Sequence, residues 1–170
     1  MLIPYDVKLY HVFVLLSGIA FLEGCASFQS GLVLDPVGPA PNASRVPGSN
    51  GVLMVFSAFD PHGHFNGSLY RRYHTDYKIF SQDGALLQVI HNDIAGVMDD
   101  PKPVELQAGR YRIVARANGY GWVTVPVLIT AHCVTTIHLE GGASWSKDRV
   151  LAGDSVRLPD GRIAGWRANQ

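Results

Sequence analysis

The feature that most constrains the fold is an alternation of apolar and polar side chains along residues 109–140. Valine or isoleucine occupies most alternate positions from Val123 to Ile129, and Tyr111 and Ile113 begin the same spacing earlier in the chain. Successive side chains on a β-strand point to opposite faces, so each of these runs has one apolar face to bury. No segment after residue 50 shows the 3.6-residue period of an amphipathic helix. The spacing therefore predicts an all-β sandwich or barrel.

Eight segments combine β-forming residues with flanking turn residues and are predicted as strands. They are residues 52–59, 70–73, 77–80, 86–91, 102–106, 109–118, 122–129 and 133–140. The Asp-Gly pair at residues 83–84 is typical of a hairpin turn. Gly119 and Gly121 permit the positive φ that a tight connection often needs. Pro126 has no backbone N–H, so we expect its strand at an edge, or this residue facing outward.

The register assigns the side chains of this region to two faces. A slip of one residue would bury Arg112 and Arg116 without partners, at a high cost in free energy. We therefore predict an interior made of Tyr111, Ile113, Val123, Val125, Val127, Ile137 and Leu139. The predicted exterior set is Arg112, Arg116, Thr124, Thr136, His138 and Glu140.

The N-terminus carries an apolar run, residues 10–22, that contains no acidic or basic side chain apart from a histidine and follows Lys8. Its length is that of a signal-peptide core and falls short of the roughly 20 residues that cross a bilayer. We therefore predict a helical signal peptide over residues 1–24. Ordinary secretion after cleavage at Ala26, an uncleaved anchor and a buried N-terminal helix remain alternatives.

The four residues Leu22-Glu23-Gly24-Cys25 that follow resemble the lipobox of bacterial lipoproteins. In that family a signal peptidase recognises an aliphatic residue, two small residues and a cysteine. The resemblance implies cleavage before Cys25 and a diacylglycerol group on its sulfur, with palmitate as a label of the anchor. The protein would then be attached to the outer or inner membrane and face the periplasm.

Beyond the signal peptide the composition divides the chain into three parts. Residues 25–50 are rich in Pro, Gly and Ser, which predicts a flexible tether. Residues 51–140 hold the predicted strands and form the domain. Residues 141–170 are expected to be a C-terminal tail that packs Trp145 and Trp166 against this domain, with a disordered tail or a partner-binding arm as alternatives.

One part of the domain carries a family resemblance. Leu106, Gly109, Tyr111 and Ile113, followed by the pair at residues 119–120, alternating valines and the Thr-rich run 135–139, resemble the PEGA and carboxypeptidase-regulatory-like group. The resemblance implies a single small Greek-key-type β-sandwich of the prealbumin (transthyretin-like) kind. Such domains serve adhesion, tethering or carbohydrate contact, and the resemblance brings no family active site.

Charge and cysteine content exclude several classes of function. The chain has 14 basic and 14 acidic residues, and loss of Asp6, Lys8 and Glu23 with the signal peptide leaves 13 and 12. This balance argues against a nucleic-acid partner, which would call for a concentrated basic face. Cys25 and Cys133 are the two cysteines, so lipidation of the first leaves no intramolecular disulfide.

The reactive side chains of the sequence indicate neither an enzyme nor a bound cofactor. Asp60, His62 and His64 on a Gly- and Pro-containing loop are weak metal candidates, and we do not predict a physiological metal site there. His132 next to Cys133 could activate the thiol, but neighbours on a strand point to opposite faces, which favours a buried, inert cysteine. Motifs for hydrolases, phosphate binding or dinucleotides do not occur in the sequence.

A ligand surface is predicted from aromatic and basic side chains. The candidates are Tyr70, Arg71, Arg72, Tyr73, Arg112, Arg116, Thr136 and His138. Exposed aromatic rings stack on sugars, and arginine binds carboxylates or phosphates with two hydrogen bonds. Trp122 and Tyr120 form a second aromatic pair. The alternative is that the aromatic residues close the ends of the core.

Together these features predict a non-catalytic, monomeric lipoprotein of the cell envelope with a structural or protein-interaction role. The membrane is contacted through the lipid on Cys25, and the further partner is an envelope protein or a glycan. The alternative function is a polysaccharide- or peptidoglycan-binding module.

The lipid anchor is directly testable. Labelling of cells with palmitate should mark a mature protein that begins at Cys25, and Cys25→Ala should abolish both the label and removal of the signal peptide. Mass spectrometry that finds an unmodified N-terminus at Ser27 would contradict the lipobox interpretation.

Overall fold

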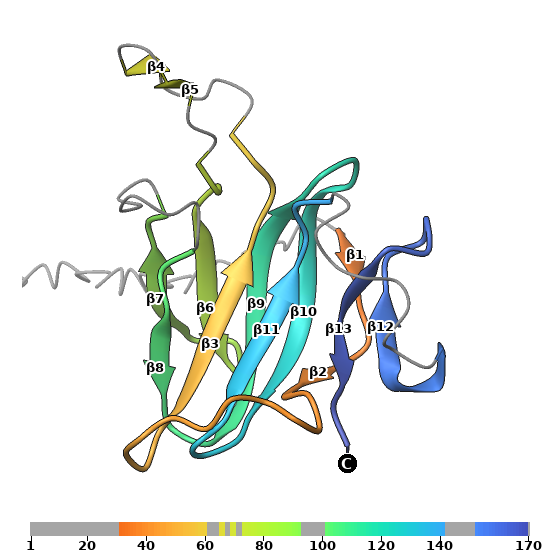
Figure 1. Ribbon diagram of the computed structural model, residues 1–170. Coiled ribbons are helices and arrows are strands. Elements are labelled where there is room, and N and C mark those ends of the chain that lie inside the picture. Colours follow the sequence, from red (N-terminus) through yellow and green to blue (C-terminus); the bar gives the residue numbers. More distant parts are fainter. Residues whose placement is uncertain are drawn as a thin grey trace, which may run out of the picture.

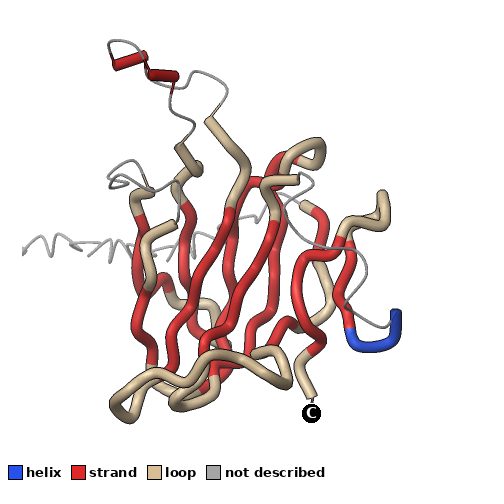
Figure 2. Tube along the Cα trace, viewed as in Figure 1, coloured by secondary structure: helices blue, strands red, loops and turns tan. Residues whose placement is uncertain are grey.

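The computed structural model describes residues 31–60, 65–66, 69–70, 73–92, 101–141 and 152–169. These residues form strands and one short 3-10 turn (Figures 1 and 2). The predicted signal peptide and Cys25 lie outside them. No helix in the described part of the chain is long and apolar enough to cross a membrane. The elements are β1 (Leu32–Val33), β2 (Val37–Gly38), β3 (Gly51–Phe56), β4 (Phe65–Asn66), β5 (Leu69–Tyr70), β6 (Tyr77–Ser81), β7 (Leu86–Ile90), β8 (Val104–Leu106), β9 (Gly109–Ala117), β10 (Gly121–Ile129), β11 (Val134–His138), the turn Ala152–Asp154, β12 (Ser155–Arg157) and β13 (Ile163–Arg167).

An eight-stranded mixed sheet, called the large sheet below, is the main layer. Its order is β12-β13-β2-β10-β9-β6-β7, and β1 also pairs with β10. The β9–β10 hairpin lies at its centre and is paired along its whole length, from Gly109 opposite Ile129 to Ala117 opposite Gly121. Gly119 and Gly121 in the turn have φ values of 88° and 66°, the left-handed region that glycine adopts without strain.

A second mixed sheet, the small sheet, has the order β11-β3-β8 and lies over one face of the large sheet (Figure 1). In it β3 runs parallel to β11 and antiparallel to β8. The two-residue strands β4 and β5 pair with each other away from both layers (Figure 1). The predicted all-β class is confirmed.

One hydrophobic core fills the space between the two sheets. Its fully buried members include Ile79, Ile113 and Val125 from the large sheet and Leu53, Val55 and Ile137 from the small sheet. The predicted interior is confirmed for six residues that are at most 2% exposed: Ile113, Val123, Val125, Val127, Ile137 and Leu139. Tyr111, the seventh, is half-buried at the margin of the core.

The predicted exposure of Glu140 is wrong. Alternation predicts its side chain outside, but β11 ends at His138, so the period of two does not extend to this residue. Glu140 is 6% exposed, although its predecessor Leu139 is buried as well. Its backbone carbonyl accepts a hydrogen bond from the Asn118 side chain, and its carboxylate accepts one from His138 Nδ1 at 2.9 Å.

The predicted flexible tether is wrong for residues 31–50. β1 and β2 pair in parallel with β10, and Val37 is completely buried. Further along, Arg45 forms an isolated antiparallel β-bridge with Cys133 through the backbone, and Val46 N donates to His132 O at 2.9 Å. The Pro and Gly residues of this segment shape turns between short apolar pieces, and those pieces are held by pairing and burial.

Pro126 explains why two short strands lie beside β10 instead of one long strand. Leu34 N donates to Thr124 O at 2.9 Å, so the backbone groups of Thr124 face β1. Residues two apart on a strand direct their backbone groups the same way, so the missing N–H of Pro126 falls on this side too. The chain leaves the ladder at Pro36 and returns at Val37, opposite Val127. The strand of Pro126 is therefore not an edge, and this side chain lies on the outward face.

The C-terminal segment adds strands instead of packing as a plain tail. β13 pairs antiparallel with β2, and β12 pairs with β13 at the edge of the large sheet. Trp166 lies opposite Gly38 in this ladder, while Trp145 lies outside the described residues. Arg167 binds Asp35 at 2.9 Å and fastens this segment to the chain between β1 and β2.

The role of residues 31–38 in the core can be measured. Val37→Ala should lower the free energy of unfolding by about 2 kcal/mol, since full burial of a valine side chain is worth about 1.5–3 kcal/mol. Val33→Ala is the matched control, because Val33 is 64% exposed and should cost less than about 0.5 kcal/mol. Equal costs in urea denaturation would mean that this segment is a tether after all.

Candidate functional site

A polar pocket of about 420 Å³ opens where β9 and β10 meet the chain segments that leave β3 and enter β6. Its lining combines two aromatic rings, two carboxylates, a guanidinium group, an imidazole and a hydroxyl. The residues are Asp60, Tyr73, His74, Thr75, Asp76, Arg116 and Trp122.

A short two-stranded ladder builds one wall of this pocket. Asp60 N donates to Tyr73 O at 2.8 Å, and Thr75 N donates to Ala58 O at 2.8 Å. Ala58 N in turn donates to Arg116 O at 2.7 Å, which ties the ladder to β9. The backbone thus holds the side chains of this wall beside those of the large sheet.

The second wall is a row of side chains across the large sheet. Trp122 lies directly opposite Arg116 in the β9–β10 ladder. Asp76, one residue before β6 begins, lines the same pocket as these two side chains. Asp76 is held from two sides, because its Oδ2 accepts from His91 Nδ1 at 2.6 Å and its Oδ1 accepts from Asn92 N at 3.2 Å. A carboxylate has about four acceptor positions, so this pairing leaves capacity for a ligand.

His74 forms the buried base of the wall. Its Nδ1 lies 2.6 Å from the Ser57 carbonyl oxygen, which can only accept, so this nitrogen is the donor and Nε2 of the neutral ring is an acceptor. The ring stacks on Phe59 at 4.7 Å and meets the edge of Phe56 at 5.6 Å. These contacts fix the ring plane and therefore the direction of Nε2.

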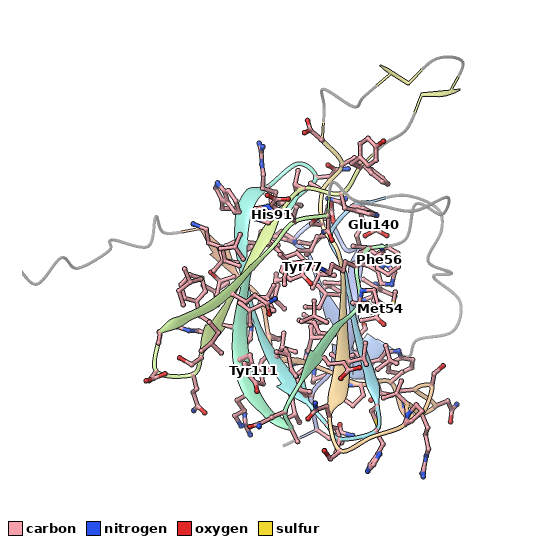
Figure 3. The ribbon with its side chains drawn as sticks, turned by 90° about the vertical axis from the view of Figure 1, so that its left-hand side faces the viewer. Met54, Phe56, Tyr77, His91, Tyr111 and Glu140 are labelled. Carbon is pink, nitrogen blue, oxygen red and sulfur yellow. The ribbon has the colours of Figure 1, made fainter. Side chains whose placement is uncertain are left out.

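The neighbouring hydroxyl groups of Thr75 and Tyr77 differ in whether a ligand can bind them. Thr75 Oγ1 is buried and has no hydrogen-bond partner within the described part of the chain, so a ligand or a water molecule can use it. Tyr77 follows Asp76 but points into the core, where burial raises the pKa of its phenol well above the ordinary value. Tyr77 therefore belongs to the core and lies between the two sheets (Figure 3).

The predicted ligand residues separate into three places. Tyr73 and Arg116 meet in the pocket, together with Asp60 from the weak metal candidates. Arg112 lies four residues before Arg116 on the same face, in a second hollow of about 180 Å³ beside Pro126. The side chain of Tyr70 and residues Arg71, Arg72, His62 and His64 lie outside the described residues.

Thr136 and His138 lie on the other layer, so they cannot share a surface with Arg112 and Arg116. The register places His138 opposite Phe56 on β3, and their rings stack at 4.5 Å. Met54 and Phe56 point away from the large sheet (Figure 3). His138 and Glu140 thus form an imidazole–carboxylate pair at the outside of the small sheet.

The other reactive candidates remain isolated. Cys133 is a free, half-buried cysteine that precedes β11, although the predicted strand begins at this residue. His132 before it has a φ of 62° and lies in a turn, whereas Cys133 forms the β-bridge with Arg45. Across the described ranges, no group of three or more His, Cys, Asp or Glu side chains could hold a metal ion.

Comparison with family models, with curated proteins and with solved structures finds no match. The resemblance to the PEGA group and to lipoprotein signals therefore stays a prediction from the residues that carry it.

The sequence alone identifies most of the pocket-lining residues as candidates but does not show that they lie together. It pairs Trp122 with Tyr120, yet the turn at Gly121 separates them, and Tyr120 packs at the core with Arg162 5.7 Å from its ring centre. Thr75 carries no sequence signal that singles it out. The available signal is the register of the β9–β10 hairpin, which places Trp122 opposite Arg116.

Proposed function

We propose that this chain is a non-catalytic lipoprotein of the bacterial cell envelope that binds glycan in the pocket at Trp122. The observation that carries the proposal is the pocket that an exposed Trp122 shares with Arg116, directly opposite it, and with Asp76. Trp122 is 43% exposed, although a tryptophan that serves only the core would be covered.

The chemistry of the pocket suits a polyhydroxylated ligand. An exposed indole offers an apolar plane to the C–H face of a sugar ring. Around it Asp60 and Asp76 supply acceptors, and Arg116 supplies several donors in a fixed plane. The pocket volume of about 420 Å³ lies within the range of roughly 300–1,000 Å³ that is typical of small-ligand sites.

Arg116 also suggests which glycans fit. Its guanidinium can bind a carboxylate with two parallel hydrogen bonds, as in acidic sugars or the lactyl and peptide groups of peptidoglycan. The two aspartates beside it disfavour highly charged polymers. A sparsely acidic cell-wall glycan therefore matches the pocket better than a polyanion.

Two further assignments complete this proposal. Cleavage before Cys25 and lipidation would hold the protein on the periplasmic side of the outer or inner membrane. The finer fold assignment is a prealbumin-like Greek-key sandwich, which is supported by two sheets with a shared core. If the protein does not bind glycan, the proposed function is instead that of a structural or protein-interaction lipoprotein.

The test is sedimentation of the protein with protein-free cell-wall glycan. The parent should bind saturably, and Trp122→Ala should weaken binding by about 2 kcal/mol, or about thirtyfold in Kd, as expected for a central aromatic contact. Arg116→Ala should also weaken binding. Arg110→Ala, on the same strand and face but outside the pocket, is the matched control and should bind like the parent.

Two results would count against glycan binding. The parent could fail to bind protein-free glycan saturably while it still co-purifies with one envelope protein. Alternatively, Trp122→Ala and Arg110→Ala could bind alike, which would move the contact away from the pocket.

A further inference from the structure

The large sheet has an outer face, defined as the face that points away from the small sheet. The described residues place no second layer on it (Figure 1). Their most exposed large apolar side chains all belong to strands of this sheet, at exposures from 37% to 64%: Val33, Leu86, Leu87, Val89 and Trp122.

Strand register brings these side chains into continuous rows. Val33 lies beside Thr124 and Val114, and the same row continues through Lys78 to Val89. The next row runs from Pro126 through Arg112 and Phe80 to Leu86. The apolar groups therefore form a band that crosses β1, β10, β9, β6 and β7.

The charge of this band has one sign. The strands β10, β9, β6 and β7 contain no acidic residue, and Lys78, Arg110, Arg112 and Arg116 point outward between the apolar groups. The acidic side chains near these strands lie where the strands begin or turn, at Asp76 and Asp83, and just after β1 at Asp35, which is paired with Arg167 at 2.9 Å. Aliphatic and basic side chains thus share one broad surface, on which the described residues place no further layer.

We propose that the outer face rests on an anionic phospholipid surface. Apolar side chains can enter the interfacial region of a bilayer, while lysine and arginine keep their charged ends at the headgroups. A second copy of this chain is the less suitable occupant. Two such faces would oppose like charges, and burying them would be costly.

The position of β1 agrees with this orientation. Val33 lies on the outer face, and an extended chain from Cys25 to Leu32 reaches at most about 25 Å. A lipid on Cys25 would thus keep this edge of the sheet close to the bilayer. The inference uses the envelope location proposed above but depends on neither the lipid nor the glycan pocket.

The test uses the full chain with Cys25→Ala, which cannot carry a lipid on that sulfur. With Trp145→Phe and Trp166→Phe added, Trp122 on the outer face is the one tryptophan left in the protein. The probes are vesicles of phosphatidylcholine alone and vesicles with about 30% phosphatidylglycerol. Flotation measures the bound fraction, and brominated acyl chains report by quenching whether Trp122 reaches the lipid.

We expect stronger binding to the anionic vesicles, a decrease with added salt, and quenching of Trp122. Lys78→Gln with Arg110→Gln should weaken this binding about 25-fold, because each basic side chain near an anionic surface contributes about fivefold. Arg45→Gln with Lys102→Gln is the matched control, because these exposed residues lie off the outer face. If the first pair does not fold, Lys78→Gln alone should give the fivefold effect.

Three results would overturn the proposal. First, the two pairs of variants could bind the anionic vesicles alike. Second, the protein could float with the vesicles while Trp122 stays unquenched, which would assign binding to the apolar residues 10–22. Third, the protein could form a lipid-free dimer that Leu86→Asp dissociates. The glycan site is tested separately, because Asp76→Asn should weaken glycan binding but not vesicle binding. Because Trp122 and Arg116 belong to both surfaces, glycan and lipid would compete for them, but either proposal can fail without the other.

Discussion

The rest of the structure depends on the residue-for-residue pairing of β9 with β10. These two strands place Ile113, Val123 and Val125 on one face, where the small sheet covers them. β6 pairs along the free side of β9, while β1 and β2 pair along the free side of β10. A shift of one residue in the hairpin would move the buried Val123, Val125 and Val127 outward and both Arg112 and Arg116 inward. The core, the pocket and the outer face would be lost together.

What the sequence predicts correctly is local in origin. A nine-residue strand contains enough alternation to reveal both its existence and its buried face, and the assignment of Ile113 and Val125 rests on that basis. Two-residue strands such as β1 and β2 contain no period to detect. Their place depends on β10, which lies far along the chain, so composition suggests a tether instead. The prediction for Glu140 fails because alternation does not continue past the end of β11.

The pocket is partly predictable for the same reason. Residue type singles out Tyr73, Arg116 and Trp122, because exposed aromatic and basic side chains suit binding. They meet because of strand pairing: Trp122 and Arg116 lie opposite each other in a hairpin, and Asp76 lies in the same pocket just before β6. Chemistry therefore identifies candidates, but only strand pairing shows which of them meet. The lipid on Cys25 concerns residues outside the described part and stays a prediction.

The position of β2 has a consequence for how the protein is made. β2 lies between β10 and β13, and Val37 is aligned with Val127 on one side and Arg167 on the other. A chain is synthesised from its N-terminal end, so β2 is made before both of its partner strands. Contacts between distant parts of a chain slow folding because the loops between them must close first. The large sheet can thus be completed only when almost the entire chain is present, and until then Val37 has neither of its partner strands.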